Sequence, residues 1–360
     1  MDNSSNDQRY IRLALDEAKK GNGWVSPNPP VGCVVVSKDN KVLATGYHKK
    51  LGEAHAEADA LNKISDDSTL KDATIYVTLE PCSHEGRTPS CAKRLAKLPI
   101  AEVVYGLVDP NPIVSGNGIK ILESAGIKTR KSSVLEEELQ NTIEQFYFNQ
   151  THKQAYLTLK IATSLDGQVA LKSGESKWIT GEAARYHARN KRGFHDAVLV
   201  GAGTLLKDNP TLDLRETPMA SKEFKLIIYD PKDKIKKIDG SFNVSKAFDQ
   251  NAIYFIKPKG SQQLGPNALI PDNFLNLRKN LFELGVYSVF AEGGSYLHSQ
   301  LLQEKCVNSL LLYMAPKVIG SKNGVSWTGD LAINKLTEAI NFSTIKTEHI
   351  GSDILLTARL

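Results

Sequence analysis

Three short segments in the first hundred residues carry the residue types of a catalytic zinc site. His55 stands two residues before Glu57, Cys82 follows Pro81, and Cys91 comes after eight intervening residues. Zinc deaminases of nucleobases combine an H-x-E segment with a P-C segment and a second cysteine. The loop between the cysteines is longer here than in that pattern, so its residues become candidates for contact with a substrate. The spacing predicts His55, Cys82 and Cys91 as zinc ligands.

The chemistry of such a site explains the residue types. A catalytic zinc ion takes three protein ligands and keeps a fourth position for water, whose pKa it lowers to roughly 7. Glu57 is close to a ligand without being one, so we expect it to move protons from the water to a ring nitrogen and to departing ammonia. The predicted reaction is hydrolytic removal of an exocyclic amine from an amidine-like ring carbon.

Other interpretations of these residues stay open on the motif alone. Cysteines often only fill a core, as we expect for Cys33 and Cys306. His84 would supply a fourth ligand if the zinc site were closed and structural, and a non-catalytic zinc module would serve as a scaffold for partners. A nucleic-acid-editing deaminase would need basic and aromatic residues interleaved in its second half, and residues 151–360 lack that pattern.

The composition is that of an ordinary folded protein with two domains. The chain has 360 residues, of which 41% are hydrophobic and 24% charged. Its net charge of +5 suits anionic small molecules rather than nucleic acid. The polar start MDNSSNDQRY is not a signal peptide, and no apolar run approaches the roughly 18 residues of a membrane span. Four cysteines in a chain of this size favour a reducing cytoplasm over a disulfide scaffold.

Hydrophobic periodicity predicts a layered α/β sandwich in the first half. The expected elements are helix 7–20, strands 31–36 and 41–48, helix 55–64, strand 73–79, helix 91–98, strand 103–107, helix 119–124 and a long amphipathic helix 135–148. This alternation is typical of a sheet covered by helices. A new strand pattern starts directly after the long helix, so we place the boundary near residue 150, between domains 1–150 and 151–360.

The second half predicts another α/β unit. The expected elements are a strand from residue 155, helix 182–192, strands 197–200, 225–229 and 252–256, helix 272–284, strand 288–291, helix 296–303, and strands 310–313 and 353–358. No G-x-G-x-x-G segment indicates a Rossmann fold. Glycines follow two strands, in segments 200–204 and 291–295, and the second segment leads into a helix whose N-terminal amides suit a phosphate. Such glycines are also common turn residues, so both interpretations remain.

Four segments of the first half, SPNPPVG, HAEADAL, PCSHEGRTPSC and VDPNP, closely resemble the deaminase domain of the bifunctional riboflavin-biosynthesis deaminase/reductase family. The resemblance implies a cytidine-deaminase-like three-layer sandwich. The residues that it implies in contact with the pyrimidine and phosphate of the substrate are Asn28, His48, His84 and Arg87. Asn28 stands between two prolines and also suits a plain turn. The family usually has Pro in place of Ser90 and a Val-His pair in place of Ala58-Asp59, and none of these residues is a predicted ligand.

Five segments of the second half, TLKIATSLDG, GESKWITG, GAGTLLKDNPTLDLR, AEGGS and APKVIG, resemble the reductase domain of the same family in the same order. The family has Val where this chain has Ala291. The resemblance implies a dihydrofolate-reductase-like α/β domain that uses NADPH. The implied cofactor contacts are Ala162, Trp178, Thr204, Asp208 and Gly294. The implied contacts to the sugar phosphate are Ser176, Arg192, Leu212, Arg215 and Glu292. Lys160 and Glu292 are candidates for moving protons as the ribose ring opens, although a strand lysine is often only a surface residue.

Together the two resemblances imply a two-step enzyme with one zinc ion per chain. The first half would remove the 2-amino group of a diaminopyrimidinone ribosyl phosphate, and the second would reduce the ribosyl group to ribityl with NADPH. The expected partners are this small molecule and further copies of the chain, as a dimer or tetramer, with no nucleic acid and no membrane. The alternative is that only one of the two domains is active.

Overall fold

The structure is a computed structural model that describes residues 3–85, 89–111, 115–261 and 267–360. The chain divides into two units, Met1–Lys153 and Gln154–Leu360, whereas the sequence pattern places the boundary near residue 150. None of the helices in the described ranges is long and apolar enough to cross a lipid bilayer.

Within the described ranges of the first unit, five strands form one sheet with the order β2-β1-β3-β4-β5. The strands are β1 (Gly32–Val36), β2 (Val42–Tyr47), β3 (Thr74–Leu79), β4 (Glu102–Leu107) and β5 (Lys128–Lys131). The helices are α1 (Asn3–Lys19), α2 (Ala56–Leu61), α3 (Cys91–Leu95), α4 (Asn117–Ser124), α5 (Glu136–Thr142) and α6 (Glu144–His152). Strands β3, β4 and β5 run parallel, so the carboxyl ends of β3 and β4 meet at one edge of the sheet.

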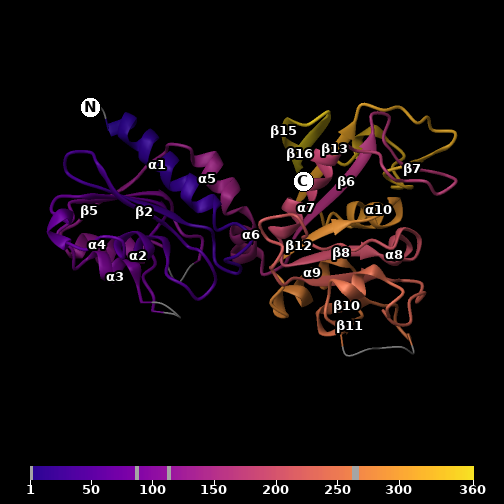
Figure 1. Cartoon of the computed structure of the whole chain (residues 1–360), viewed down its shortest axis with the longest axis horizontal. Coiled ribbons are helices and arrows are strands. Elements are labelled where there is room, and N and C mark those ends of the chain that lie inside the picture. Colours follow the sequence, from indigo (N-terminus) through magenta and orange to yellow (C-terminus); the bar gives the residue numbers. More distant parts are fainter. Residues whose placement is uncertain (1–2, 86–88, 112–114, 262–266) are drawn as a thin grey trace. The chain divides into compact units, whose positions relative to one another are not determined.

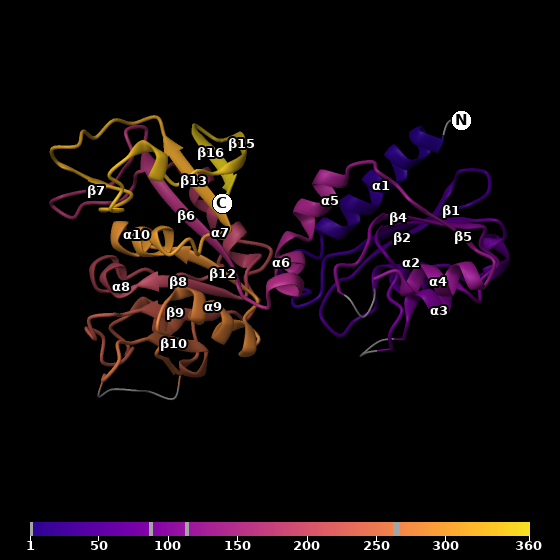
Figure 2. The same ribbon diagram turned by 180° about the vertical axis from the view of Figure 1, so that it is seen from behind.

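Alternating side chains give this sheet two apolar faces. In β1, Cys33 and Val35 pack into a core with α2, α3 and α4, whereas Val34 and Val36 pack against α1 and α5. Figures 1 and 2 show α1 and α5 on one face of the sheet and α2, α3 and α4 on the other. The first unit is therefore the three-layer sandwich that the sequence predicts.

In the described part of the second unit, nine strands form a mixed sheet with the order β11-β10-β9-β8-β12-β6-β13-β16-β15, and β7 pairs with β14. The strands are β6 (Tyr156–Ser164), β7 (Gln168–Leu171), β8 (Ala197–Gly201), β9 (Lys225–Tyr229), β10 (Ile253–Ile256), β11 (Ala268–Leu269), β12 (Ser288–Glu292), β13 (Ser309–Ala315), β14 (Gly324–Ser326), β15 (Ser343–Ile350) and β16 (Asp353–Arg359). The helices are α7 (Glu182–Gly193), α8 (Ala202–Asp208), α9 (Phe274–Glu283) and α10 (Ser295–Gln303).

Helices cover both faces of this sheet. Leu199 and its neighbours on one face pack against α9 and α10, whereas Val198 and Val200 on the other face pack against α8, and Phe290 against α7. Strands β6, β8 and β12 run parallel, so their carboxyl ends lie at the same edge of the sheet. In parallel α/β sheets ligands bind beyond this edge.

The predicted fold class is confirmed for both halves, and several elements need correction. The single helix expected over 135–148 is two helices, because Ile143 leaves helical geometry with φ −104° and ψ 12°. Strands β5, β7, β11, β14 and β15 and helix α8 were not predicted from the sequence. Strands β5 and β15 pair at sheet edges and have the polar sequences KTRK and STIKTEHI, so no apolar alternation marks them.

Candidate active sites

The three predicted zinc ligands converge from three elements of the first unit. His55 immediately precedes α2, Cys82 follows β3, and Cys91 is the first residue of α3. Their ligand atoms lie within 4.8 Å of one another, with His55 Nδ1 3.5 Å from Cys82 Sγ and 3.7 Å from Cys91 Sγ. Zn–N bonds of about 2.1 Å and Zn–S bonds of about 2.3 Å put neighbouring ligand atoms about 3.6 Å apart around a tetrahedral ion. The donor set therefore fits zinc.

Hydrogen bonds within the ligand set favour the thiolate form of Cys82. The pKa of Cys82 is lowered by its hydrogen bonds with the Cys91 thiol and with His55, and the Cys91 backbone N–H also donates to Cys82 Sγ at 3.3 Å. The pKa of Cys91 is raised by its hydrogen bond with Cys82 and by burial. Among the described residues the group contains only these three ligands, so His84, which a closed four-ligand site would require, is not part of it.

Glu57 lies on α2 directly beside this group. Its side chain is buried, with 4% of the residue exposed. Burial raises the pKa of Glu57 to about 7, and the negative charge of Cys82 adds to the effect. A carboxyl group that titrates near neutrality both accepts and returns protons at physiological pH. This property is the one that the predicted proton shuttle needs.

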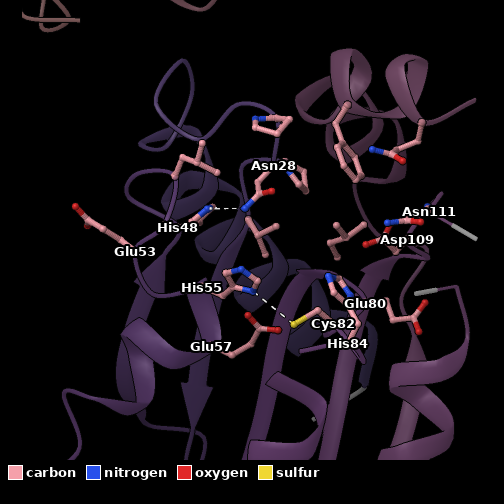
Figure 3. A pocket seen from close by; sticks show the side chains of 18 residues that line it. Asn28, His48, Glu53, His55, Glu57, Glu80, Cys82, His84, Asp109 and Asn111 are labelled. Carbon is pink, nitrogen blue, oxygen red and sulfur yellow. Dashed lines mark hydrogen bonds between the residues drawn. The ribbon is translucent and has the colours of Figure 1, made fainter. Parts of the chain in front are cut away.

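A cavity of about 390 Å³ adjoins the ligands and Glu57. Figure 3 shows the side chains that line it, among them the predicted substrate contacts Asn28, His48 and His84. The fourth predicted contact, Arg87, lies outside the described residues. The cavity thus brings together the candidates of the first half that the structure describes, except Cys91, which lies buried behind it.

A hydrogen-bonded pair fixes one wall of this cavity. His48 Nδ1 lies 3.1 Å from the carbonyl oxygen of Ala54, which can only accept, so Nδ1 carries the proton. His48 Nε2 is then an acceptor, and Asn28 Nδ2 donates to it at 3.2 Å. Burial lowers the pKa of His48, which keeps the ring neutral. The Asn28 amide is therefore held in one orientation.

The opposite wall contains two residues that the sequence analysis did not assign to the site. Asp109 and Asn111 follow the carboxyl end of β4, next to the strand that leads to Cys82. Asp109 is only 7% exposed, and its Oδ1 accepts a 2.8 Å hydrogen bond from the Asn111 backbone N–H. Burial raises the pKa of Asp109 to about 6. Both residues belong to the VDPNP segment, which carried part of the resemblance but suggested no role.

Two residues of the first half that depart from the usual family sequence, Ser90 and Asp59, form defined contacts. Ser90 caps α3 by accepting from the Lys93 N–H at 3.2 Å, and its hydroxyl donates to the Cys82 carbonyl oxygen at 2.9 Å. It therefore ties together the two ends of the loop between the cysteines. Asp59 forms ion pairs of 2.8 Å with both Lys49 and Lys63 on the far side of α2 from the cavity lining.

A second cavity, of about 630 Å³, lies in the second unit beyond the carboxyl ends of β6, β8 and β12. It is lined by all the candidates of the second half except Gly294, namely Lys160, Ala162, Ser176, Trp178, Arg192, Thr204, Asp208, Leu212, Arg215 and Glu292. Arg185 and Arg189 of α7 also line it and were not predicted. Four guanidinium groups make this cavity suited to a phosphate.

A charged triad stands in the wall of this second cavity. Glu292 at the end of β12 accepts a 2.6 Å hydrogen bond from Arg192 Nε, and its other oxygen lies 3.7 Å from Lys160 Nζ. Burial alone would raise the pKa of Glu292, but the two cations lower it overall. Burial lowers the pKa of Lys160, and Arg192 adds to this effect. Lys160 is thus a cavity-lining lysine and not a surface residue.

A third cavity, of about 560 Å³, shares Ser176, Thr204 and Asp208 with the second. Gly294 lies in its lining at the N-terminal end of α10, where backbone amides suit a phosphate. Three lysines, Lys207, Lys232 and Lys234, line the same cavity. The two adjoining cavities therefore offer room for two polar ligands side by side, each with basic groups.

Both halves of the chain match models of known protein families. Residues 4–107 match the cytidine and deoxycytidylate deaminase zinc-binding region, and residues 155–356 match the RibD C-terminal domain. The predicted zinc ligands all fall within the first of these matches.

Curated proteins match along nearly the whole chain. The riboflavin biosynthesis protein RibD of Aquifex aeolicus (strain VF5) is 37% identical, and the match covers 97% of each chain. RibD of Escherichia coli (strain K12) is 34% identical over 97% of this chain and 98% of its own. Among solved structures, the Thermotoga maritima diaminohydroxyphosphoribosylaminopyrimidine deaminase/5-amino-6-(5-phosphoribosylamino)uracil reductase has a TM-score of 0.88, at 34% identity and 99% coverage of both chains. Acinetobacter baumannii RibD, form 1, has a TM-score of 0.87, at 32% identity and 99% coverage of both chains.

Proposed function

Because the chain belongs to the RibD family of bifunctional riboflavin-biosynthesis proteins and has both the deaminase and the reductase domain, we propose that its two units catalyse consecutive reactions on one pyrimidine nucleotide. The first unit hydrolyses 2,5-diamino-6-(5-phosphoribosylamino)pyrimidin-4-one to 5-amino-6-(5-phosphoribosylamino)uracil and ammonia. The second unit reduces the ribosyl group of that product to ribityl with NADPH.

The observation that carries the deaminase proposal is the convergence of three zinc-type ligands beside a buried carboxyl group. His55, Cys82 and Cys91 have tetrahedral spacing, and Glu57 shares the adjoining cavity. Three ligands leave a fourth position, as in catalytic rather than structural zinc sites. A scaffold module would have no need for a carboxyl group whose pKa is raised to about 7 at this position.

In this proposal, zinc supplies the polarisation that lowers the pKa of a water molecule to about 7. Glu57 carries one proton of the attacking water to the ring nitrogen and then the second to the departing amine, which leaves as ammonia. Asn28 and His48 hold the pyrimidine by one edge, since their hydrogen bond fixes which polar atoms the wall presents. His84 and Arg87 bind the phosphate of the same substrate.

In the second step, the sugar phosphate binds in the second cavity, beside its arginines. NADPH binds across the second and third cavities. Arg192, Arg215 and Ser176 bind the phosphate, and Leu212 packs beside the sugar. The cofactor contacts are Ala162, Trp178, Thr204, Asp208 and Gly294. The nicotinamide supplies the hydride. Lys160, held by Glu292, gives or takes the proton as the ribose ring opens.

Separate assays of the two half-reactions test this function. Purified protein should release ammonia from the diaminopyrimidine substrate and should oxidise NADPH when given the deaminated product. Cys82→Ser and Cys91→Ser should lose bound zinc and ammonia release together while NADPH oxidation persists. If wild-type protein gave neither signal, the proposal would be wrong. If only one signal appeared, one of the two domains would be inactive.

A further inference from the structure

Lys257 is a buried lysine that no step of the proposed reactions uses. It follows the last residue of β10, and Asp230 follows the last residue of β9, the parallel neighbour of that strand (Figure 2). Tyr229 pairs with Ile256 in the register of these strands, so the two residues that come next lie side by side. The side chains of Asp230 and Lys257 are only 1% and 2% exposed. A buried ammonium group costs free energy unless charged and polar partners surround it.

The ammonium group of Lys257 makes its hydrogen bonds with one short segment, residues 230–235. It donates to Asp230 Oδ2 at 2.9 Å, to Asp233 Oδ1 at 2.6 Å and to the carbonyl oxygen of Ile235 at 2.6 Å. Because an ammonium group has three N–H donors, this segment satisfies all of them. Burial alone would lower the pKa of Lys257, but the hydrogen bonds to Asp233 and Asp230 raise it overall, so the lysine stays charged.

Bonds within the segment 230–235 fix its backbone as well. The Asp230 carbonyl oxygen accepts from the Asp233 N–H at 3.1 Å, which closes a turn. The Asp230 carboxylate accepts from the Lys234 N–H at 2.9 Å and from the Ile235 N–H at 2.8 Å. Residues 230, 233 and 235 therefore anchor the segment, whereas Lys232 and Lys234, which stand between these anchors, are exposed and line the third cavity.

We propose that Lys257 is a positioning residue for cofactor selection, which holds Lys232 and Lys234 where they meet the extra phosphate that distinguishes NADPH from NADH. This inference rests on the proposed use of NADPH by the second unit and deepens it. Lys257 is not among the described residues that line the third cavity, so it acts on the cofactor through the segment 230–235. Lysines on a segment that is already fixed lose less conformational freedom when a phosphate binds, and this preorganisation increases affinity.

Isothermal titration calorimetry of the full-length protein with NADP⁺ and with NAD⁺ tests this inference. Lys257→Met keeps the length of the side chain but removes its three donors, so the NADP⁺ affinity should fall by about three- to tenfold while the NAD⁺ affinity stays the same. In protein that already carries Lys232→Gln and Lys234→Gln, the further change Lys257→Met should have no effect, because positioning acts only through these two lysines. Lys222→Met is the matched control, since it removes a lysine of the same unit that anchors another segment through two backbone carbonyl oxygens, at 2.8 Å each. It should keep the wild-type preference for NADP⁺.

A second pair of variants keeps the buried pair of Lys257 and Asp230, so it tests the same inference even if Lys257→Met does not fold. Asp233 has a φ of 50°, which both Gly and Asn accept. Asp233→Asn keeps an oxygen for the ammonium group and should keep the preference for NADP⁺. Asp233→Gly removes the same charge and also the oxygen, and it should weaken NADP⁺ binding by about threefold.

Three results would decide against the inference or its premise. Equal losses of affinity for both nucleotides in Lys257→Met would overturn it, because the lysine would then support only the fold. The same loss of NADP⁺ affinity with and without the lysines at 232 and 234, or equal NADP⁺ affinities of Asp233→Gly and Asp233→Asn, would overturn it as well. If wild-type protein bound neither nucleotide, the proposed reductase function would fail instead.

Discussion

Arg192 Nε and Glu292 Oε1 form a hydrogen bond of 2.6 Å that joins α7 to the carboxyl end of β12 in the wall of the second cavity. Residues a hundred positions apart in the chain are thereby fixed in the cavity to which we assign the sugar phosphate. Lys160 approaches the other oxygen of the same carboxylate, so one acid balances two cations. The acid thus holds both basic groups in place.

Replacing this acid should weaken both the fold and the second reaction. Glu292→Gln leaves Arg192 and Lys160 close together without a balancing charge, and we expect the free energy of unfolding to fall by about 1–3 kcal/mol. NADPH oxidation should fall sharply, because Lys160 loses the partner that orients it. Urea unfolding and NADPH oxidation check the two effects. Asp272→Asn, which breaks the exposed pair with Lys259, is the control and should leave both measurements near wild type.

Glu57→Gln should stop deamination without removing the metal. The amide is close in size to the acid but cannot accept and return a proton, so we expect kcat for ammonia release to fall by about 10²- to 10⁴-fold. Zinc bound per chain should stay the same, because Glu57 is not one of the three ligands. NADPH oxidation with the deaminated product serves as an internal control. Loss of zinc in this variant would show that Glu57 supports the metal site rather than the chemistry.

Ser90 should matter for holding zinc as well as for stability. Ser90→Ala removes the cap of α3 and the hydrogen bond to the Cys82 carbonyl oxygen, so it should cost about 1 kcal/mol and speed zinc loss to a chelator. Asn273→Ala is the matched control, since it removes the side-chain cap of α9 in the other unit. Equal zinc release from both variants would mean that Ser90 acts on stability alone.

Histidine burial should make the second unit sensitive to acid. His195 donates to the Lys191 carbonyl oxygen and accepts from the Thr158 hydroxyl, and burial lowers its pKa to about 3. The unfolded chain, where the pKa is about 6.5, binds the proton first, so stability falls as pH drops below 6.5.

The expected loss is about 1.4 kcal/mol per pH unit, or about 2 kcal/mol between pH 6.5 and 5. Unfolding in urea at pH 7.5, 6 and 5 measures it. His195→Gln should reduce the slope by about this amount, whereas the exposed His349→Gln should keep it. A smaller slope should remain, because burial also lowers the pKa of His298 in the same unit to about 4. An unchanged slope in His195→Gln would assign the acid sensitivity to other groups.

The convergence of the three candidate zinc ligands could be predicted because each stands at the end of a recognisable element. His55 and Cys91 begin helices, and Cys82 follows a strand of β-branched residues. Short-range patterns therefore located all three. Asp109 could not be found this way, because an Asp before Pro is ordinary turn chemistry. It reaches the cavity only because β4 lies parallel to β3, and this pairing joins residues far apart in sequence.

The second unit was harder to predict, because its local sequence patterns do not show which residues meet in a cavity. Its candidate residues came from resemblance, since glycines after β8 and β12 suit turns as well as phosphates. Helix α8 was missed because its sequence, AGTLLKD, begins as a glycine turn and is short. The lysines at residues 232 and 234 follow β9 in an exposed segment, and nothing in the local pattern separates them from Lys236 and Lys237. Only the structure places the first pair in a cavity lining.

The position of Lys232 and Lys234 in the third cavity lining predicts that they favour NADP⁺ over NAD⁺. Lys232 and Lys234 line the third cavity and form no ion pair with the described residues, so their charges are available to an extra phosphate. NADP⁺ carries such a phosphate and NAD⁺ does not. Partly solvated ion pairs contribute about 0–1 kcal/mol each, so Lys232→Gln with Lys234→Gln should weaken NADP⁺ binding by about tenfold.

Isothermal titration calorimetry with NADP⁺ and with NAD⁺ measures both affinities without any turnover. The matched control is Lys236→Gln with Lys237→Gln, which removes the same charge from the same segment outside the cavity lining. It should leave the NADP⁺ affinity near wild type, and neither double variant should change the NAD⁺ affinity. Equal losses for both nucleotides would mean that the two lysines shape the cavity rather than recognise the phosphate. Equal losses in both double variants would instead point to the overall charge of the segment.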